Sequence, residues 1–376
     1  MATPLCSYFG DCAGCAFQQV DYSLQLERKK QILARVVNKK TEEIRVYSAE
    51  PYHYRNRLEF LFGTRGFGLR NKDGKIIPID RCVIAEKNIN NNLTEVNEFF
   101  EKFILKSISI VDVLKTFQGL VIRTTSQGSS SLSIVIKSGA PKQEWAIEKI
   151  KEFSLYSSCE NVLLTITDNG ELYSADYLVL KGQDYLEEVL VEKRFQYPIQ
   201  GFFQNNTKMA KEIQKYVRWL ISNYSSDSNN STKKAQLLDL YSGVGGFGIV
   251  NADLFQKVTL IESFAPAIGY AKKNIELNNV KNTEGYAFEV KKMRRLKFLE
   301  ELYVITDPPR IGMEEETINI LKSLKPKIII YVSCNVEQLK KDLLKFKNYT
   351  IKSAALFDLF PQTKHMETVV ELVLSI

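Results

Sequence analysis

The sequence predicts an α/β protein whose C-terminal part, residues 201–376, is built on a parallel sheet. From Gln236 onward, short apolar runs typical of strands alternate with segments of helical periodicity. This alternation is the pattern of a parallel sheet with helices packed on it. The last two strand-like runs, 350–360 and 368–376, are separated only by PQTKHME. The simplest interpretation is that the sheet ends in an antiparallel hairpin.

The length and composition are those of a folded protein with two or three domains. The chain has 376 residues, of which 44% are apolar and 25% charged, and these values exclude bulk disorder, collagen and coiled coil. It contains no run of about 18 consecutive apolar residues, and its start lacks the segments of a secretory signal. We therefore expect a cytoplasmic protein that does not contact a membrane. A formal net charge of +7 is compatible with a polyanionic partner.

The first part of the chain, residues 1–90, contains a cysteine cluster, a charged helix expected at 22–38, and the basic aromatic segment YHYRNRLEFLF. Cys6, Cys12 and Cys15 lie close together, and Cys82 follows 67 positions after Cys15. Four thiolates are enough for tetrahedral zinc or for a [4Fe-4S] cluster, and the spacing alone does not decide between them. Because the core of this part would be small, a metal centre could help to stabilise it.

The central part, residues 91–200, is expected to be an α+β domain. Strand-like runs such as LVIRTT, SLSIVIKSG and NVLLTITDNG are separated by Gly and Ser turns, with helices expected at 93–105 and 142–153. A further helix, expected at 208–224, has Asn206 or Thr207 available as its cap. The polar stretch SSDSNNSTKK, residues 225–234, indicates a linker or surface loop between this helix and the parallel sheet.

A glycine-rich turn opens the C-terminal sheet. LLDLYSGVGGFGI, with Gly243 and Gly245, places a strand before a turn that begins a helix, so that the backbone can approach a nucleotide-like cofactor. Glu262 ends the next strand, where an acidic side chain can accept hydrogen bonds from ribose hydroxyls. A turn without ligand is the alternative. Dinucleotide and adenosylmethionine binders share this turn, and the closing antiparallel hairpin favours adenosylmethionine.

Several separate motifs resemble those of one family. They are the four cysteines at positions 6, 12, 15 and 82, and the segments GFFQNN, LLDLYSGVGGFGI, DPPRIGM, YVSCN and LFPQTKHMETVVEL. Together they are similar to the adenosylmethionine-dependent RNA uracil-C5 methyltransferases, which make 5-methyluridine in 23S rRNA and tRNA. The resemblance implies a class I, Rossmann-like methyltransferase domain at 201–376 and a small iron–sulfur, RNA-contacting region at 1–90. The short length, with no preceding RNA-binding β-barrel, is most like the 23S rRNA members.

The chemistry of this family requires a nucleophile and a base, and the sequence has a candidate for each. Carbon 5 of uracil reacts poorly with a methyl sulfonium unless a nucleophile first adds to carbon 6. Cys334 ends the strand KIIIYVS and matches the family's nucleophile, although alone it would be taken for a buried small residue. Glu367 matches the family's base, which removes the proton from carbon 5 after methyl transfer. A solvated carboxylate at the sheet edge is the alternative for Glu367.

The resemblance also implies a set of binding residues. Adenosylmethionine is expected to contact Gln204, Tyr241, Glu262 and Asp307, and the [4Fe-4S] cluster is expected at Cys6, Cys12, Cys15 and Cys82. RNA contacts are expected from Arg55, Arg57 and Arg310, with surface charge as the alternative for Arg310. Phe202 or Phe203 is expected near a flipped base, or in the core. His365 is interpreted as a surface residue and Cys159 as a core residue.

Other functions remain open at the level of the sequence. The same reaction on the T-loop uridine of tRNA is the nearest alternative. A second is an RNA-binding or assembly factor that has lost turnover, which the intact Cys334 and Glu367 disfavour. Methylation of a base amino group would not need the Cys334 thiol. No protein partner is implied.

Overall fold

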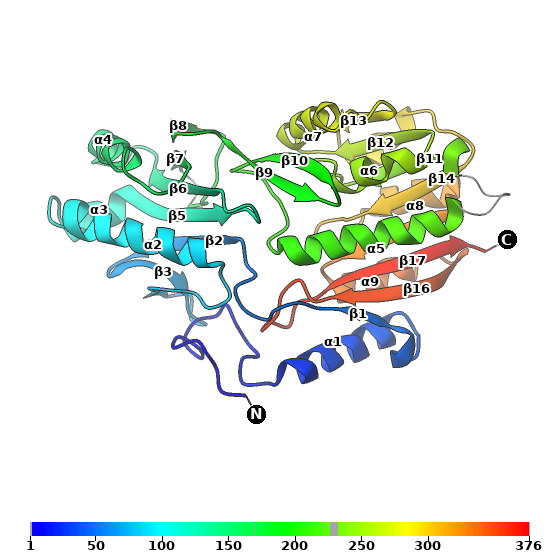
Figure 1. The fold of residues 1–376 in the computed structure, drawn as a ribbon, viewed down its shortest axis with the longest axis horizontal. Helices are drawn as coiled ribbons and strands as arrows, with labels where there is room; N and C mark the ends of the chain where they lie inside the picture. The colour runs from blue at the N-terminus through cyan, green and yellow to red at the C-terminus, as the bar shows by residue number, and fades with distance from the viewer. Residues whose placement is uncertain (1, 169, 226–231, 376) are drawn as a thin grey trace.

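The structure is a computed structural model that describes residues 2–168, 170–225 and 232–375. Two large sheets lie side by side along the long axis of the molecule, and a two-stranded ribbon connects them (Figure 1). The polar stretch expected as a linker at 225–234 falls mostly on residues 226–231, which lie outside the described residues.

The larger sheet has eight strands and belongs mainly to the C-terminal part of the chain. Its strands are parallel except for β17, which lies antiparallel between β15 and β16. The predicted hairpin is therefore confirmed. In spatial order the strands are β1 (Arg45–Tyr47), β16 (Tyr349–Phe357), β17 (Glu367–Leu374), β15 (Ile328–Ser333), β14 (Leu302–Thr306), β11 (Gln236–Leu240), β12 (Lys257–Glu262) and β13 (Thr283–Ala287).

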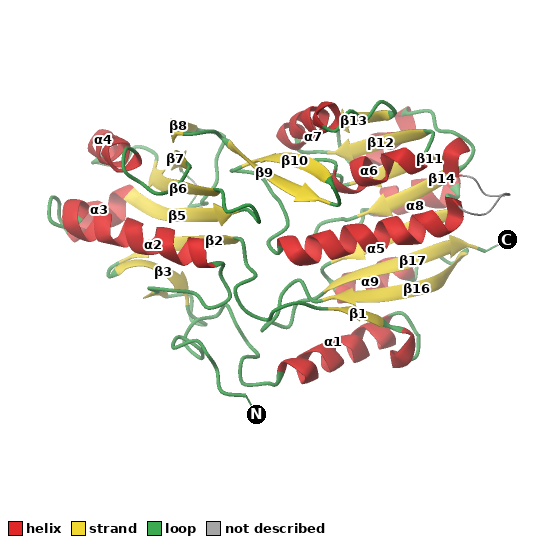
Figure 2. Ribbon diagram, viewed as in Figure 1, coloured by secondary structure: helices red, strands yellow, loops and turns green. Residues whose placement is uncertain are grey.

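Helices cover both faces of this sheet (Figure 2). On one face α5 (Thr207–Ser225), α6 (Gly246–Asn251) and α7 (Ala265–Leu277) share a buried core with the strands. On the other face α1 (Tyr22–Val36), α8 (Glu315–Leu324) and α9 (Val336–Leu343) share a second buried core with the strands. The expected cap of α5 is confirmed, because the Asn206 side chain accepts a hydrogen bond from the Met209 amide at 3.2 Å. Short 3-10 turns occur at Thr41–Glu43, Thr232–Lys234, Ala252–Leu254 and Val290–Arg295.

The smaller sheet has seven strands and one well-covered face. Its strands, in order, are β4 (Ile76–Pro78), β3 (Gly66–Arg70), β2 (Arg57–Gly63), β5 (Phe117–Thr124), β6 (Ser130–Lys137), β7 (Asn161–Thr167) and β8 (Tyr177–Lys181). Only β6 and β7 are parallel. The covering helices are α2 (Lys87–Phe99), continued by a π turn at Phe100–Ile104, α3 (Ile110–Thr116) and α4 (Gln143–Ser154). An α+β unit was expected from the sequence at this place.

The ribbon of β9 (Tyr185–Leu190) and β10 (Lys193–Pro198) joins the two sheets. Its tight turn places Val191 and Glu192 at φ of 47° and 64°, the left-handed values that a two-residue hairpin loop requires. Apolar side chains of the ribbon pack against residues of α6 and α7. The last residues of β10 then lead directly into the GFFQNN segment.

Strand pairing distributes the first 90 residues over both sheets. β1 extends the larger sheet by pairing with β16, whereas β2, β3 and β4 belong to the smaller sheet. A three-strand sheet of their own would be too small to bury a core, and the larger sheets supply that core. These pairings join residues on both sides of the predicted boundary at 90. The division into domains at residues 90 and 200 stays a prediction. In the described ranges no helix is long and apolar enough to cross a membrane.

Candidate active site

The candidate active site lies at the carboxyl ends of the parallel strands. β11, β14 and β15 end side by side, and the loops that follow them enclose a cavity of about 850 Å³. An open crevice at this edge is where sheets of this kind bind their ligands. Of the residues singled out in the sequence, the cavity is lined by Arg55, Gln204, Tyr241, Gly243, Glu262, Asp307, Arg310, Cys334 and Glu367.

The glycine-rich loop after β11 forms one wall of the cavity. Tyr241, Gly243 and Gly245 all have positive φ, at 59°, 53° and 88°. A Cβ atom at Gly243 would meet only open space, so the glycine serves the backbone conformation and leaves room for a ligand. Gly245 does not line the cavity but caps the start of α6. The loop can therefore approach a cofactor closely.

Glu262 and Asp239 hold this loop in place from opposite sides. The Glu262 carboxylate accepts hydrogen bonds from the Gly243 amide at 3.2 Å and the Phe264 amide at 2.8 Å. Asp239 accepts from the Gly248 amide at 2.7 Å, which ties the first turn of α6 to β11. Burial raises the pKa of Asp239 to about 8, although the Gly248 hydrogen bond opposes the shift. The partly exposed Glu262 carboxylate is thus the acidic group available to ribose hydroxyls.

Cys334 and Glu367 are brought together by the antiparallel pairing of β15 with β17. Ser333 lies opposite Thr368 in that register, and the Thr368 hydroxyl donates to the Ser333 carbonyl at 3.0 Å. The next residue on each side is Cys334 and Glu367, so continuation of the register places them opposite each other. Asp307, at the end of β14, approaches the same point from the neighbouring strand.

These three groups influence one another strongly. Burial raises the pKa of Glu367 well above its usual range, and Asp307 raises it further while Arg310 opposes the shift. Burial likewise raises the pKa of Asp307 to about 7. Burial raises the pKa of the Cys334 thiol to about 11, with added contributions from Glu367 and Asp307 and an opposing one from Arg310. At neutral pH Cys334 is therefore a neutral thiol until its surroundings change.

The proline-containing loop after β14 carries Arg310 to the cavity. The Asn335 side chain donates to the Arg310 carbonyl at 2.8 Å, which joins this loop to the residue that follows Cys334. The Arg310 side chain is exposed, so its guanidinium remains available to a ligand. Its position favours a binding role over mere surface charge.

Some expected residues lie elsewhere, and others were missed. Arg57 does not line the cavity, because it is in β2 and forms an ion pair with Glu59 at 2.7 Å. His365, expected on the surface, is half-buried and lines the cavity. Phe202 is 69% exposed at the cavity, whereas Phe203 stacks on Tyr197 with ring centroids 4.0 Å apart. Of these two, Phe202 is the exposed side chain, and its contact with a base stays a prediction.

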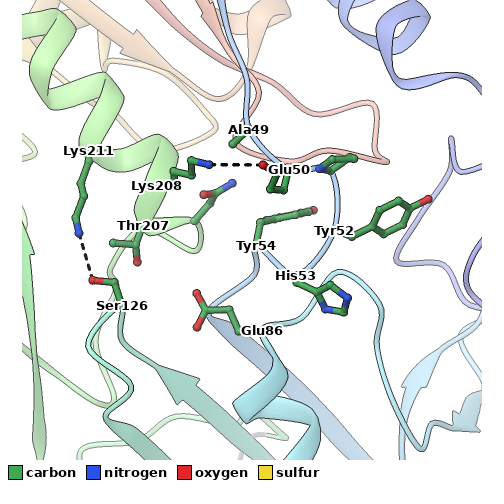
Figure 3. Close-up of a pocket in the computed structure, with 12 residues that line it drawn as sticks. Ala49, Glu50, Tyr52, His53, Tyr54, Glu86, Ser126, Thr207, Lys208 and Lys211 are labelled. Carbon is green, nitrogen blue, oxygen red and sulfur yellow. Dashed lines mark hydrogen bonds and ion pairs between the residues drawn. The ribbon is translucent and has the colours of Figure 1, made fainter.

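A second cavity, of about 620 Å³, lies on the other side of the segment that carries Arg55. Tyr54 lines this second cavity and Arg55 the active-site cavity, so one chain segment separates the two. Figure 3 shows Lys208 directed toward Glu50 and Lys211 toward the Ser126 hydroxyl, at 3.9 Å and 3.2 Å. These lysines already have partners, and the predicted catalytic residues do not reach this cavity.

The four cysteines of the expected cluster are neighbours. Burial raises the pKa of Cys15 to about 12, and Cys82, Cys12 and Cys6 all contribute to the shift. Nevertheless, within residues 2–168, 170–225 and 232–375 no group of three or more His, Cys, Asp or Glu side chains is arranged to hold a metal ion. The four cysteines expected as ligands are thus close to one another, but the described structure does not arrange them around a position for a metal ion.

Comparison with known proteins agrees with this geometry. The sequence profile of the family described as tRNA (uracil-5-)-methyltransferase matches residues 21–374. A protein described as an uncharacterized RNA methyltransferase, from Caldanaerobacter subterraneus subsp. tengcongensis, is 33% identical over 390 residues, covering 97% of this chain and 83% of the relative. The tRNA (uracil(54)-C(5))-methyltransferase of Pyrococcus abyssi is 28% identical over 373 residues, covering 98% and 86%.

A solved structure is similar along almost the whole chain. The Pyrococcus abyssi tRNA (uracil-54, C5)-methyltransferase, in complex with S-adenosyl-L-homocysteine, has a TM-score of 0.78 and 26% identity. The match covers 97% of this chain and 86% of that chain. The fold is therefore that of an α/β methyltransferase. The chain belongs to the tRNA (uracil-5-)-methyltransferase family, and it is an adenosylmethionine-dependent RNA uracil-C5 methyltransferase.

The electrostatics of the site predict how the Cys334 thiol titrates. Glu367→Gln removes a negative charge that raises the pKa of the thiol, so we expect its titration midpoint to fall below the value of about 11. Arg310→Gln removes the opposing positive charge and is expected to raise the midpoint. The measurement is the rate of iodoacetamide alkylation of the Cys334 peptide as a function of pH, read by mass spectrometry.

Glu337→Gln is the matched control for this titration. Glu337 is exposed in the first turn of α9, close to Cys334 in sequence, and is not among the groups that shift the thiol. An unchanged midpoint in Glu367→Gln, or equal shifts in all three variants, would contradict the geometry of the site.

Proposed function

We propose that the protein methylates carbon 5 of a uridine in RNA through a covalent bond between Cys334 and carbon 6. The observation that carries the proposal is the placement of Cys334 opposite Glu367, at the cavity edge where Asp307 and Arg310 also meet. A nucleophile and a buried carboxyl group of raised pKa are the two groups that this reaction needs.

The cofactor side of the cavity fits adenosylmethionine. The space beside Gly243 is open, the Glu262 carboxylate lies at the end of β12, and the Ser242 hydroxyl is buried without a hydrogen-bond partner in the described structure. We propose that Gln204, Tyr241, Glu262 and Asp307 contact the cofactor, with Glu262 accepting from the ribose hydroxyls. When bound, adenosylmethionine supplies an electrophilic methyl group to the uracil ring.

The proposed reaction has three steps, which are addition, methyl transfer and elimination. Water in the open cavity takes the proton of the Cys334 thiol, and the sulfur adds to carbon 6. The electron pair of the carbon 5–carbon 6 double bond then forms an enolate in which carbon 5 is nucleophilic. After carbon 5 has taken the methyl group, leaving S-adenosylhomocysteine, Glu367 removes the remaining hydrogen from carbon 5 as a proton. The carbon 5–carbon 6 double bond forms again as the bond from carbon 6 to the Cys334 sulfur breaks, and Cys334 leaves as a thiolate.

The substrate class proposed first is 23S rRNA, as expected from the resemblance to the shorter members of the family. A tRNA uridine is the second candidate, and it is favoured by the similarity to the Pyrococcus abyssi enzyme whose name specifies uracil 54 of tRNA. Arg55 and Arg310 line the cavity and are proposed to contact the RNA, and Phe202 to pack near the flipped base. Arg57, already paired with Glu59, stays a prediction. We propose the cytoplasm as the compartment, because both candidate RNAs occur there.

We also propose that Cys6, Cys12, Cys15 and Cys82 hold a [4Fe-4S] cluster. The mutual influence of these four thiols supports the proposal, since four thiolates are a complete ligand set. Zinc is the second candidate for the same ligands. The role would be structural, or in RNA folding, because the methyl transfer requires no electron.

The substrate proposal predicts the product nucleoside. The protein, prepared anaerobically, is incubated with adenosylmethionine and total RNA from a strain that lacks its gene, and nucleosides of separated tRNA and rRNA are analysed. We expect 5-methyluridine in 23S rRNA. Cys334→Ala should abolish 5-methyluridine formation. Glu367→Gln should slow turnover by about 10²- to 10⁴-fold, and Cys159→Ala should remain active as a matched cysteine control.

5-Methyluridine in tRNA alone would change the substrate, and a different methylated nucleoside would overturn the mechanism.

The cluster proposal predicts the metal content. Anaerobically prepared protein should contain about four irons and four acid-labile sulfides per chain, and Cys82→Ala should lose most of them. Cys159→Ala should keep them, because Cys159 is buried in the smaller sheet's core. Stoichiometric zinc without iron would contradict the proposal.

A further inference from the structure

The loop between β16 and β17 leads into the catalytic base. It spans residues 358–366, and Glu367 is the first residue of β17. Phe360, Thr363 and His365 of this loop line the active-site cavity. One oxygen of the Glu367 carboxylate, Oε1, is buried without a hydrogen-bond partner among the described residues. The position of the base therefore depends on the strand and the loop that hold its backbone.

A reciprocal glutamine pair fastens this loop to the N-terminal part of the chain. The Gln25 Nε2 atom donates to the Gln362 side-chain oxygen Oε1 at 3.0 Å, and the backbone N–H of Gln362 donates to Gln25 Oε1 at 3.2 Å. Both residues are buried, 1% and 3% exposed. Gln25 lies in α1, 337 positions before Gln362, so the pair closes a very long loop of chain.

The cysteine segment is fastened at the same point. The amides of Ala16 and Phe17 both donate to the Gln362 carbonyl, at 2.9 Å and 3.0 Å. The Gln25 Nε2 atom also contacts the carbonyls of Phe17 and Val20, at 3.0 Å and 2.8 Å. Gly14, two residues before Ala16, lines the active-site cavity. Residues 14–17 thus reach the cavity at Gly14 and bind, through Ala16 and Phe17, the loop that leads to Glu367.

A buried ion pair anchors the start of the loop. Lys29 Nζ lies 2.6 Å from Asp358 Oδ1, with the two side chains 2% and 0% exposed, and also donates to the Phe360 carbonyl at 3.2 Å. The Tyr22 hydroxyl donates to the other Asp358 oxygen at 2.8 Å. Removing one member of such a pair leaves an unpaired buried charge and threatens the fold itself. The neutral glutamine pair is therefore the better place to test the effect of this contact.

We propose that Gln25 and Gln362 are positioning residues for the catalytic base: their hydrogen bonds set the loop that places Glu367 beside carbon 5 of the methylated uracil. The inference rests on the proposed function and adds the N-terminal segment to the machinery of its last step. Neither Gln25 nor Gln362 lines the active-site cavity. Their effect is expected on proton removal, and not on the addition of Cys334 or on methyl transfer.

Displacement of Glu367 is expected to make one covalent intermediate accumulate. If Glu367 is displaced, the methyl group has been transferred but the proton on carbon 5 stays, so the bond from Cys334 to carbon 6 cannot break. The enzyme should then accumulate covalently attached to methylated RNA. A loss of general stability would lower all steps together and would not enrich this species.

The test measures that species in Gln25→Ala. The variant is incubated with total RNA and adenosylmethionine labelled in the methyl group, and the label that migrates with the denatured protein on a gel is compared with the label in free RNA. We expect the covalent share to rise clearly above wild type and kcat to fall by roughly tenfold, as for a small misplacement of a catalytic group, with KM nearly unchanged. Gln362→Gly is the second variant. It removes the partner side chain, and with it the hydrogen bond from Gln25 Nε2, at a φ of 67° where glycine is unstrained. The backbone contacts of residue 362 remain, so the covalent share should rise in the same direction even if Gln25→Ala folds poorly.

Two controls separate the possible results. Gln31→Ala changes an exposed glutamine of the same helix, whose side chain donates only to Glu27, and should match wild type. Glu367→Gln should accumulate the covalent species because the base itself is gone. If Glu367→Gln traps RNA while Gln25→Ala and Gln362→Gly resemble Gln31→Ala, the positioning role is wrong. If Glu367→Gln also traps no RNA, the proposed function fails.

Discussion

The insertion of β17 between β15 and β16, antiparallel to both, is the constraint on which the site depends. Because Ser333 pairs with Thr368, continuation of the register places Cys334, just after β15, opposite Glu367, the first residue of β17. A shift of the register by one residue would send alternate side chains to the opposite face of the sheet and separate the two groups. A β17 parallel to β15 would carry Glu367 to the far edge. The proposed nucleophile and the proposed base therefore both depend on a single strand pairing.

Burial raises the pKa of both Cys334 and Glu367. Two carboxyl groups and a thiol lie at one wall of the cavity, with Glu367 buried and Asp307 and Cys334 half-buried, so the charged form of each is disfavoured and its pKa rises. The positive charge of Arg310 opposes the shifts of Glu367 and Cys334. A base whose pKa lies above that of an exposed carboxylate is better matched to take a proton near neutral pH. The resting thiol, in turn, is protected from reaction until the site is rearranged by its ligands.

Much of this could be predicted from the sequence, because the relevant signals are local. The period of the apolar residues indicated the parallel strands, the short PQTKHME connection indicated the hairpin, and the glycine-rich turn indicated the cofactor loop. Since parallel strands end at one edge, Asp307 and Cys334 could be placed together without a structure. Contacts between distant segments left no such signal. The pairing of β1 with β16, the Gln25–Gln362 contact and the arrival of Gly14 at the cavity each join residues far apart in sequence.

The side chains whose positions were predicted wrongly also depend on contacts that the local sequence does not reveal. Arg55 and Arg57 look equivalent in YHYRNR, but Arg57 enters β2 and pairs with Glu59, whereas Arg55 precedes the strand and reaches the cavity. His365 looked like a surface residue because the N-terminal segment packed against its loop is not visible in the sequence around it. The neighbouring segment HMETVV predicted Glu367 just before the last strand, and in the structure Glu367 is the first residue of β17 and lines the cavity.

The most direct test of the central claim is to follow the hydrogen on carbon 5 itself. RNA labelled with tritium at carbon 5 of uridine is incubated with the protein and adenosylmethionine, and tritium released to water is compared with methyl groups transferred. Proton removal by Glu367 after addition of Cys334 predicts one tritium released per product methyl group in wild type and none in Cys334→Ala. Glu367→Gln should transfer methyl groups while retaining the tritium. Methyl transfer without tritium release in wild type, or undiminished release in Cys334→Ala, would contradict the account.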